Sequence, residues 1–203
     1  MAVAGVILAG GRSTRMGSPK ALLDFRGAPF VVRILEVLEV LDVRPRLVVV
    51  GPGGGAIRAA LADHDCLVVE NADVAGGPIA SLRVALQALH PVQPAGVLTW
   101  PVDLPHIRLT TVERLLDSYR QDGAPVVVPA FGARRGHPVL WDASLFAELL
   151  TSVEAARRGA RAVLQAHRAA ARVVPVDDPA VVDSLNTPED YQRLVRSVNR
   201  DIY

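Results

Sequence analysis

One stretch decides the fold of this chain: Val3-Ala4-Gly5-Val6-Ile7-Leu8-Ala9-Gly10-Gly11-Arg12-Ser13-Thr14-Arg15-Met16-Gly17-Ser18-Pro19-Lys20. Its apolar, partly β-branched start predicts a buried strand, which passes directly into a glycine-rich loop. Adjacent glycines let consecutive backbone amides turn toward an anion, and Arg12, Arg15 and Lys20 add positive charge around them. The stretch therefore predicts a strand that delivers a loop to the phosphates of a nucleoside triphosphate.

Two better-known phosphate loops have a different spacing. In a Walker A loop the lysine directly follows a glycine, whereas here Ser18-Pro19 separates Gly17 from Lys20. The dinucleotide fingerprint needs a third glycine that opens a helix, and Gly10-Gly11-Arg12-Ser13 does not supply it. The remaining alternative is a strand followed by a loop that is basic by chance, and the length and order of the whole pattern favour the phosphate site.

The composition of the 203 residues bounds the class of protein. Residues 1–203 are 50% apolar, which suits a single α/β domain with a sizeable core, and a formal charge of +1 gives no field for capturing nucleic acid. The single cysteine, Cys66, excludes an intramolecular disulfide and a thiolate metal cluster, and we expect it to pack as a small apolar residue. The sequence shows no charged leader and no membrane-spanning run, so we expect a cytoplasmic protein.

Apolar, β-branched runs alternate with segments of helical period along the chain. This alternation predicts an α/β fold with a mostly parallel central sheet and helices on both faces. The expected strands are 3–8, 46–50, 66–69, 95–99 and 125–128, and the expected helices are 30–38, 78–89, 109–121 and 188–198.

Two further segments have structural interpretations. Gly51-Pro52-Gly53-Gly54-Gly55 follows an expected strand and predicts a flexible turn at its carboxyl end, where a nucleotide contact stays open. Glu154–Ala171 is rich in alanine and arginine, which indicates helix with the arginines on a solvated face.

A lone carboxylate closes the expected central strand. Residues 95–105 read AGVLTWPVDLP, which places Asp103 between Pro101 and Pro105. Ligands of open α/β sheets collect outside the carboxyl ends of strands, and the prolines restrain the backbone around Asp103. One carboxylate suits Mg²⁺, which completes its octahedron with water and phosphate oxygens. The alternative is an Asp that accepts amide hydrogen bonds in a turn.

The opening stretch resembles the MobA-like nucleotidyltransferases, which include the molybdenum-cofactor guanylyl- and cytidylyltransferases. Their motif reads Leu-Ala-Gly/Ala-Gly-x-Ser-x-Arg-Met-Gly-x-x-Lys, and every fixed position is present from Leu8 to Lys20. The resemblance implies a Rossmann-like three-layer α/β/α sandwich and the transfer of a nucleoside monophosphate with release of pyrophosphate. It also implies that Asp103, within Pro-x-Asp-x-Pro, is the magnesium aspartate.

The end of the chain carries a second element of the family. In Asn186-Thr187-Pro188-Glu189-Asp190, Thr187 is the expected N-cap and Pro188 the first residue of a helix, which explains most of the pattern by capping alone. The resemblance implies that Asn186 approaches the metal from the far side of the cleft. A neutral amide oxygen is a weaker magnesium ligand than a carboxylate, so both interpretations stay open.

The resemblance also assigns residues to the two substrates. It implies nucleotide contacts in the loop that enters the second helix, at Asn71, Gly77, Pro78 and Ser81, although turning of the backbone explains the glycines equally well. In Arg134-Arg135-Gly136-His137-Pro138-Val139 the guanidinium groups and imidazole suit a phosphate on the acceptor, so we expect Arg135, Gly136 and His137 to contact it, unless they form a solvated hairpin tip. We expect structural or surface roles for the remaining histidines: His64, His90, His106 and His167.

These residues suggest a Mg²⁺-dependent nucleotidyltransferase that uses CTP or GTP. Lys20 and Arg15 would neutralise the triphosphate, Leu8, Ala9, Gly10, Gly11, Arg12 and Ser13 would surround the phosphates, and Asp103 and Asn186 would hold the metal. Gly10 resembles the guanylyltransferases, whereas Gly136-His137 and Pro101-Val102-Asp103 resemble the cytidylyltransferases. The expected acceptor is molybdopterin, with molybdoenzymes or cofactor-biosynthesis proteins as partners. The alternatives are a sugar-1-phosphate nucleotidyltransferase and a non-catalytic nucleotide-binding or cofactor-delivery module.

Overall fold

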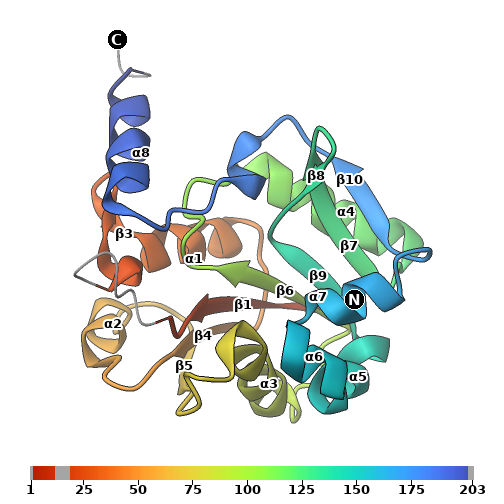
Figure 1. Cartoon of the computed structure of the whole chain (residues 1–203). Coiled ribbons are helices and arrows are strands. Elements are labelled where there is room, and N and C mark those ends of the chain that lie inside the picture. The colour runs from red at the N-terminus through yellow and green to blue at the C-terminus, as the bar shows by residue number, and fades with distance from the viewer. Residues whose placement is uncertain (1, 12–18, 201–203) are drawn as a thin grey trace.

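A single twisted sheet forms the centre of the computed structural model, which describes residues 2–11 and 19–200 (Figure 1). Its strands run in the spatial order β10-β7-β9-β6-β1-β4-β5, with β8 paired to β7. The strands are β1 (Val3–Ala9), β4 (Arg46–Val50), β5 (Leu67–Glu70), β6 (Gly96–Pro101), β7 (Val126–Phe131), β8 (Arg134–Arg135), β9 (Val139–Asp142) and β10 (Arg172–Pro175). A separate hairpin pairs β2 (Asp24–Phe25) with β3 (Ala28–Pro29).

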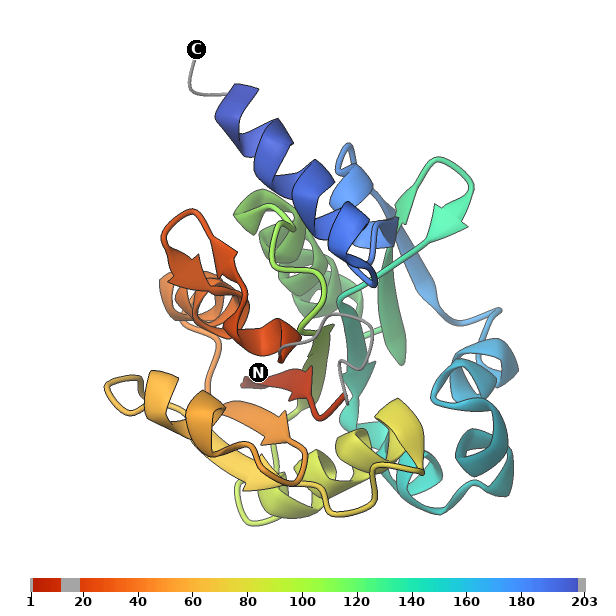
Figure 2. The ribbon, with the colours of Figure 1, turned by 60° about the vertical axis from the view of Figure 1, so that its left-hand side comes forward.

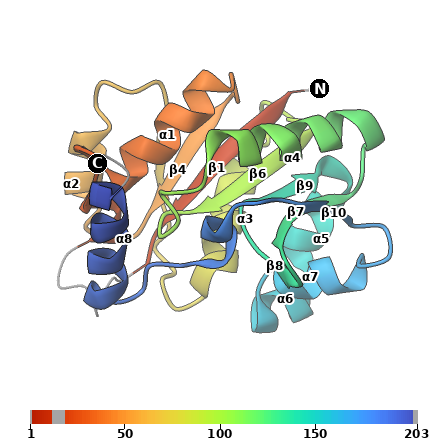
Figure 3. The ribbon, with the colours of Figure 1, turned by 90° about the horizontal axis from the view of Figure 1, so that it is seen from above.

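Helices cover both faces of the sheet (Figure 3). One face is covered by α1 (Phe30–Val40) and α4 (Leu109–Asp122), and the opposite face by α3 (Gly77–Leu89), α5 (Phe146–Thr151), α6 (Val153–Arg158) and α7 (Arg161–Ala166). The remaining elements are α2 (Gly55–Ala60), α8 (Pro188–Arg200) and the 3-10 turns η1 (Lys20–Leu22), η2 (Ala143–Leu145) and η3 (Pro179–Val182). This is the Rossmann-like three-layer sandwich that we expected, and the fold prediction is confirmed.

Alternating side chains of the central strands fill two separate cores. In β1, Ile7 packs with α1 and α4, while Val6 packs with α3 on the other face. Trp100 of β6 and Trp141 of β9 show the same division, the first in the α1 and α4 core and the second in the α3 core. Because both faces are buried, the strands are apolar almost throughout, as parallel sheets require.

Four of the seven strand pairs described in the central sheet are parallel, and the antiparallel pairs involve β8 and β9. The pairs of β1 with β4 and β6, of β4 with β5 and of β10 with β7 are parallel. β9 lies antiparallel between β6 and β7. The carboxyl ends of β1, β4 and β6 therefore meet at one edge of the sheet, where open α/β sheets bind ligands.

The last helix lies outside the two helical layers, beside the β2–β3 hairpin and α1 (Figure 2). The Tyr191 hydroxyl donates to the main-chain oxygen of Asp24 at 2.9 Å, and its ring meets Phe30 edge-on. Leu194 is buried in the α1 and α4 core. These contacts tie the start of α8 to the N-terminal half of the chain.

The five expected strands and four expected helices all occur, with shifted ends in several cases. The structure adds the short strands β2, β3, β8, β9 and β10 and the helices α2 and α5, and it divides the arginine-rich segment into α6 and α7. Among the described residues, none of the helices combines the length and apolarity needed to cross a bilayer.

Candidate active site

A tight turn at the carboxyl end of β6 positions Asp103. The amide of Leu104 donates to the oxygen of Pro101 at 3.2 Å, and the indole Nε1 of Trp100 donates to the oxygen of Leu104 at 2.9 Å. The amide of Val102 also donates to the oxygen of Leu8 at 3.1 Å, which fixes this turn against the end of β1. The carboxylate itself takes no part in these bonds, so it is available at the sheet edge.

Lys20 lies opposite Asp103, at the start of η1. Its Nζ is 3.8 Å from Oδ2 of Asp103 and donates to Oδ1 of Asn186 at 2.9 Å. The side chains of Lys20 and Asp103 are only 15% and 22% exposed, so water screens their charges less than on an open surface. Lys20 is the only lysine of the chain, in which all other fixed cationic side chains are arginines.

The segment before α8 brings Asn186 to this pair. The amide of Leu185 donates to the oxygen of Asp103 at 3.0 Å. The Asp190 carboxylate accepts the amides of Asn186 at 3.0 Å and Thr187 at 2.9 Å, while Oγ1 of Thr187 accepts the amide of Asp190 at 3.2 Å. The hydrogen bonds from Asn186 and Thr187 lower the pKa of Asp190 to about 2. The hydrogen bond from Leu185 to Asp103 thus joins residues far apart in sequence, and the capping box at the start of α8 fixes the main chain at Asn186 beside them.

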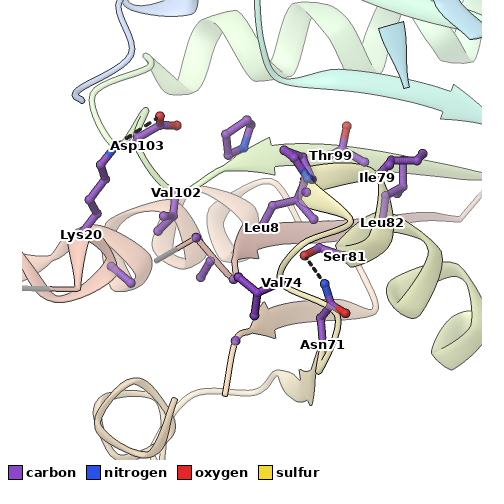
Figure 4. A pocket seen from close by; sticks show the side chains of 18 of the residues that line it. Leu8, Lys20, Asn71, Val74, Ile79, Ser81, Leu82, Thr99, Val102 and Asp103 are labelled. Carbon is purple, nitrogen blue, oxygen red and sulfur yellow. Dashed lines mark hydrogen bonds and ion pairs between the residues drawn. The ribbon is translucent and has the colours of Figure 1, made fainter. Parts of the chain in front are cut away.

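Lys20 and Asp103 line one end of a cavity of about 790 Å³ (Figure 4). Asn186, which is hydrogen-bonded to Lys20, lines it as well. This volume is in the upper part of the range for ligand sites, about 300–1,000 Å³. The predicted nucleotide contacts that line the cavity are Leu8, Ala9, Gly10, Gly11, Lys20, Asn71, Gly77, Pro78 and Ser81. Arg12, Ser13 and Arg15 lie outside the described residues.

Gly10 and Gly51 allow the ends of β1 and β4 to approach each other closely. A Cβ on Gly51 would lie 3.0 Å from the oxygen of Gly10, and a Cβ on Gly10 would lie 3.1 Å from Oγ of Ser81. Residues 51–54 line the cavity, and α2 starts at Gly55. Gly10 of the opening motif is therefore also needed for the close packing of β1 against the loop after β4 and against Ser81.

Asn71 and Ser81 line the cavity, but their side chains are hydrogen-bonded to each other, and Asn71 is also hydrogen-bonded to the loop that follows it. Nδ2 of Asn71 donates to Oγ of Ser81 and to the oxygen of Asp73, both at 3.0 Å, and Oδ1 accepts the amide of Asp73 at 3.0 Å. Both side-chain donors of Asn71 are thus used internally. The side chain shapes the loop that carries Gly77 and Pro78, and Gly77 has the positive φ of 67° that favours glycine.

Of the predicted acceptor contacts, the structure brings only His137 to the cavity. Arg135 lies on the exposed strand β8, and Gly136 packs against η3, where a Cβ would lie 2.0 Å from the oxygen of Val181. The His137 amide donates to the same oxygen at 2.9 Å. Burial lowers the pKa of His137, while the negative charge of Asp103 acts in the opposite direction. Of Arg135, Gly136 and His137, only His137 therefore lines the cavity.

Two arginines that the sequence analysis assigned to a solvated face also line the cavity. Arg158 ends α6 and Arg161 starts α7, and Gly159 and Ala160 between them line it as well. Their sequence context is that of any exposed, arginine-rich helix, so the pattern carried no signal that could have found them.

The residues at the Lys20 end fit a magnesium ion. Asp103 offers a carboxylate and Asn186 an amide oxygen, the hard oxygen ligands that Mg²⁺ takes in small number. Within the described ranges, His, Cys, Asp and Glu form no group of three that could hold a metal. A site here would therefore depend on phosphate oxygens and water for its other ligands.

Comparison with known proteins identifies the family of the chain. A family model described as the MobA-like NTP transferase domain matches residues 5–173. The chain belongs to the MobA-like NTP transferase family. It is similar to the nicotine blue oxidoreductase of Paenarthrobacter nicotinovorans, with 30% identity over 95% of this chain and 96% of the relative. It is also similar to the molybdenum cofactor guanylyltransferase of Rhodobacter capsulatus, with 29% identity over 95% of both chains.

Solved structures extend the likeness to the whole architecture. The crystal structure of Rv0371c from Mycobacterium tuberculosis superposes with a TM-score of 0.81 at 30% identity, covering 97% of this chain and 99% of that one. A second crystal structure of Rv0371c, described as a complex with manganese, superposes with a TM-score of 0.77 at 28% identity, covering 97% of this chain and 100% of that one. A member of this fold thus binds a divalent metal.

Proposed function

We propose that this MobA-like protein is a Mg²⁺-dependent nucleotidyltransferase, with residues 1–203 as its single domain. It transfers a nucleoside monophosphate from CTP or GTP to a phosphorylated acceptor and releases pyrophosphate. The observation that carries the proposal is the cluster of Lys20, Asp103 and Asn186 at the carboxyl ends of β1 and β6, inside a cavity that the glycine-rich loop also lines. Family membership and the manganese complex of Rv0371c support it.

The reaction is an in-line displacement at the α-phosphorus. An oxygen of the acceptor phosphate forms the new P–O bond, the bond between the α- and β-phosphates breaks, and pyrophosphate leaves with the electron pair. Lys20 neutralises the triphosphate and the leaving group, and the main chain at Ala9, Gly10 and Gly11 surrounds the phosphates. Asp103 and Asn186 would hold a magnesium ion, which would supply charge neutralisation for the reacting phosphates. Positioning and electrostatics thus provide the rate enhancement, without a covalent intermediate.

Molybdopterin is the proposed acceptor. The similarity to the molybdenum cofactor guanylyltransferase of Rhodobacter capsulatus supports this choice. CTP remains as good a candidate as GTP, because Gly10 resembles the guanylyl subgroup while Gly136-His137 and Pro101-Val102-Asp103 resemble the cytidylyl subgroup.

The single lysine provides a direct test of nucleotide binding. Reductive methylation with ¹³C-formaldehyde keeps the charge of Lys20 and gives one lysine NMR signal beside that of the N-terminal amine, and Lys20→Arg identifies the signal by its loss. We expect the Mg²⁺ complex of CTP or GTP to shift it, and those of ATP and UTP to shift it less. If none of the four triphosphates moves the signal or gives heat in calorimetry, the proposal is wrong.

Turnover tests the catalytic assignments. Lys20→Ala and Asp103→Ala should each lower pyrophosphate release by about a hundred- to a thousandfold, because each removes a preorganised charge from the reacting phosphates. Asp177→Ala is the matched control, since Asp177 is an exposed carboxylate whose side chain has no interaction among the described residues. A variant at position 20 or 103 that keeps the wild-type rate would refute its assignment.

An oxidoreductase is a second candidate, favoured by the 30% identity to nicotine blue oxidoreductase over nearly the full length of both chains. The two functions differ in the reaction that is measured. Turnover of a redox substrate, with no pyrophosphate released from any of the four triphosphates, would support the second candidate over the first.

A further inference from the structure

The cavity has a second cationic end at the turn between α6 and α7, which lies on the opposite side of the molecule from α8 and so from the Lys20 end (Figures 1 and 3). Among its lining residues that the structure describes, the fixed positive charges belong to Lys20, Arg158 and Arg161. The two arginines are brought there by the turn between α6 and α7, in which Gly159 has a φ of 76° that favours glycine. The backbone turn at Gly159 therefore brings both arginines to the cavity.

These arginines differ from those that have structural partners. Arg83, for example, donates to the main-chain oxygens of Leu149 at 2.9 Å and Ser152 at 2.8 Å. It thus connects α3 to α5 and to the residue between α5 and α6. Arg161 makes no hydrogen bond or ion pair with any residue of the described ranges. Arg158 has only a 3.9 Å contact with Glu154. Both guanidinium groups keep their donors for another molecule.

The cavity wall between the two cationic ends is mainly apolar. It includes Val139 and Trp141 of β9 and Ile79 and Leu82 of α3. Two hydroxyls also line the cavity here. That of Thr99 donates to the oxygen of Val139 and accepts from Nε1 of Trp141, and that of Ser81 accepts from Nδ2 of Asn71. A molecule that bridges the two ends therefore needs an apolar middle section.

Sheet order indicates which substrate reaches the arginines. The loop 51–54 follows β4 and Asn71 follows β5, so the predicted nucleotide contacts cluster on the β1, β4 and β5 side. Trp141 and Val139 lie on β9, beyond β6, and the helices α6 and α7 belong to the core that contains Trp141. The predicted nucleotide contacts thus lie on one side of the cavity, and the arginines lie beside the other side, which is available to the acceptor.

From these observations we infer that Arg158 and Arg161 bind an anionic group of the acceptor, remote from the group that reacts. The inference rests on the proposed function and narrows the acceptor to a compound that has a second anionic group besides its nucleophile. It therefore favours such an acceptor over molybdopterin, whose single phosphate is the reacting group. The acceptor has its nucleophile at the Lys20 end, an apolar body against Trp141 and Val139, and a phosphate or carboxylate at the α6–α7 turn. Arginine suits this task because its planar fork binds such oxyanions through two parallel hydrogen bonds.

Phenyl phosphate is a suitable probe, with benzoate as the carboxylate arm and benzyl alcohol as the uncharged control. Each is titrated into full-length protein while the Nε–Hε signals of the arginines and the ¹³C-methyl signal of Lys20 are recorded together. The variant is Arg158→Gln combined with Arg161→Gln. Arg157→Gln is the matched control, because Arg157 lies on the same helix, meets the same Glu154 at 3.9 Å and does not line the cavity.

We expect phenyl phosphate to shift the signals of Arg158 and Arg161 in wild-type protein and in Arg157→Gln. The double variant should bind it at least about tenfold more weakly, as loss of a charge-assisted bidentate contact predicts. Benzyl alcohol should leave the arginine signals unchanged. Equal binding by the double variant, equal weakening by Arg157→Gln, or a shift of Lys20 alone would each overturn the inference.

The same spectra separate this inference from the proposed function. Binding of MgCTP or MgGTP, read from the Lys20 signal, should be the same in the wild-type protein and in the double variant. If no triphosphate shifts Lys20 while phenyl phosphate still binds through the arginines, the proposed function fails and the assignment of an acceptor fails with it. If the triphosphates bind and the arginine signals stay still, only the inference is wrong.

Discussion

At the scale of single residues, the position of Asp103 depends on its main chain and not on its carboxylate. Hydrogen bonds at Leu104, Trp100 and Leu185 hold the turn, while the carboxylate meets Lys20 only at 3.8 Å. A pair of this kind contributes about 1 kcal/mol or less to stability. We therefore expect Asp103→Ala to lower the free energy of unfolding by no more than about 1 kcal/mol, measured by urea, while it loses turnover. A much larger drop would show that the carboxylate also holds the fold.

His106 is a second residue whose environment has a measurable consequence. It lies three residues after Asp103, and neither ring nitrogen finds a hydrogen-bond partner among the described residues. Burial lowers the pKa of His106, and the charges of Asp183 and Asp178 only partly oppose this effect. Because the ring already meets Phe25 edge-on, His106→Phe should raise the free energy of unfolding by about 1 kcal/mol. Urea unfolding measures it, with His90→Phe, at an exposed position, as the neutral control.

The same histidine makes stability depend on pH, and the sign follows from the direction of the shift. A pKa lowered in the folded state means that the unfolded chain binds the proton more readily below about pH 6.5. The free energy of unfolding should therefore fall as the pH drops below that value, with His137 contributing in the same direction. In His106→Phe this fall should be smaller. An unchanged pH dependence would contradict the assignment to His106.

At the scale of elements, the capping box at the start of α8 is the device that places Asn186 in the site. Asp190→Ala removes the acceptor for the amides of Asn186 and Thr187, so we expect a loss of about 1 kcal/mol in stability and about a tenfold loss in kcat/KM. Glu189→Ala is the matched control, since Glu189 lies in the same first turn without a hydrogen bond to the described residues. Equal kcat/KM in the two variants would show that the cap does not position Asn186.

Elements with a long apolar pattern were predictable from the sequence, and short ones were not. β1, β4 and β7 are buried on both faces and therefore read as continuous apolar runs. β9 has four residues and follows a proline, so nothing in its sequence shows that it inserts antiparallel between β6 and β7. The split of the arginine-rich segment at Gly159 was equally hidden, because composition indicates helix but not where the helix turns.

At the scale of the whole molecule, the two ends of the cavity differ in how far the sequence revealed them. The Lys20 end was predictable because a glycine-rich loop and an acid after a strand have a physical reason to be there, and sheet order brings such strand ends together. Arg135 and Gly136 were expected at the acceptor end, but the hairpin that carries them turns toward η3, as the hydrogen bond from Arg134 to the oxygen of Val182 shows. The arginines that do line that end are Arg158 and Arg161. They come from α6 and α7, and the local sequence does not show where these helices pack in the fold.

Nucleotide binding should stabilise the molecule as a whole, because the cavity joins the glycine-rich loop, β6 and the segment before α8. A ligand that binds only the folded state at about 100 times its Kd adds about 2.7 kcal/mol to the free energy of unfolding. For a chain of this size that corresponds to a rise of about 5–10 °C in Tm. We expect this rise with the preferred triphosphate and Mg²⁺, and a smaller one with EDTA or in Asp103→Ala. A rise that is the same with and without the metal would mean that Asp103 does not hold a magnesium ion in the nucleotide complex.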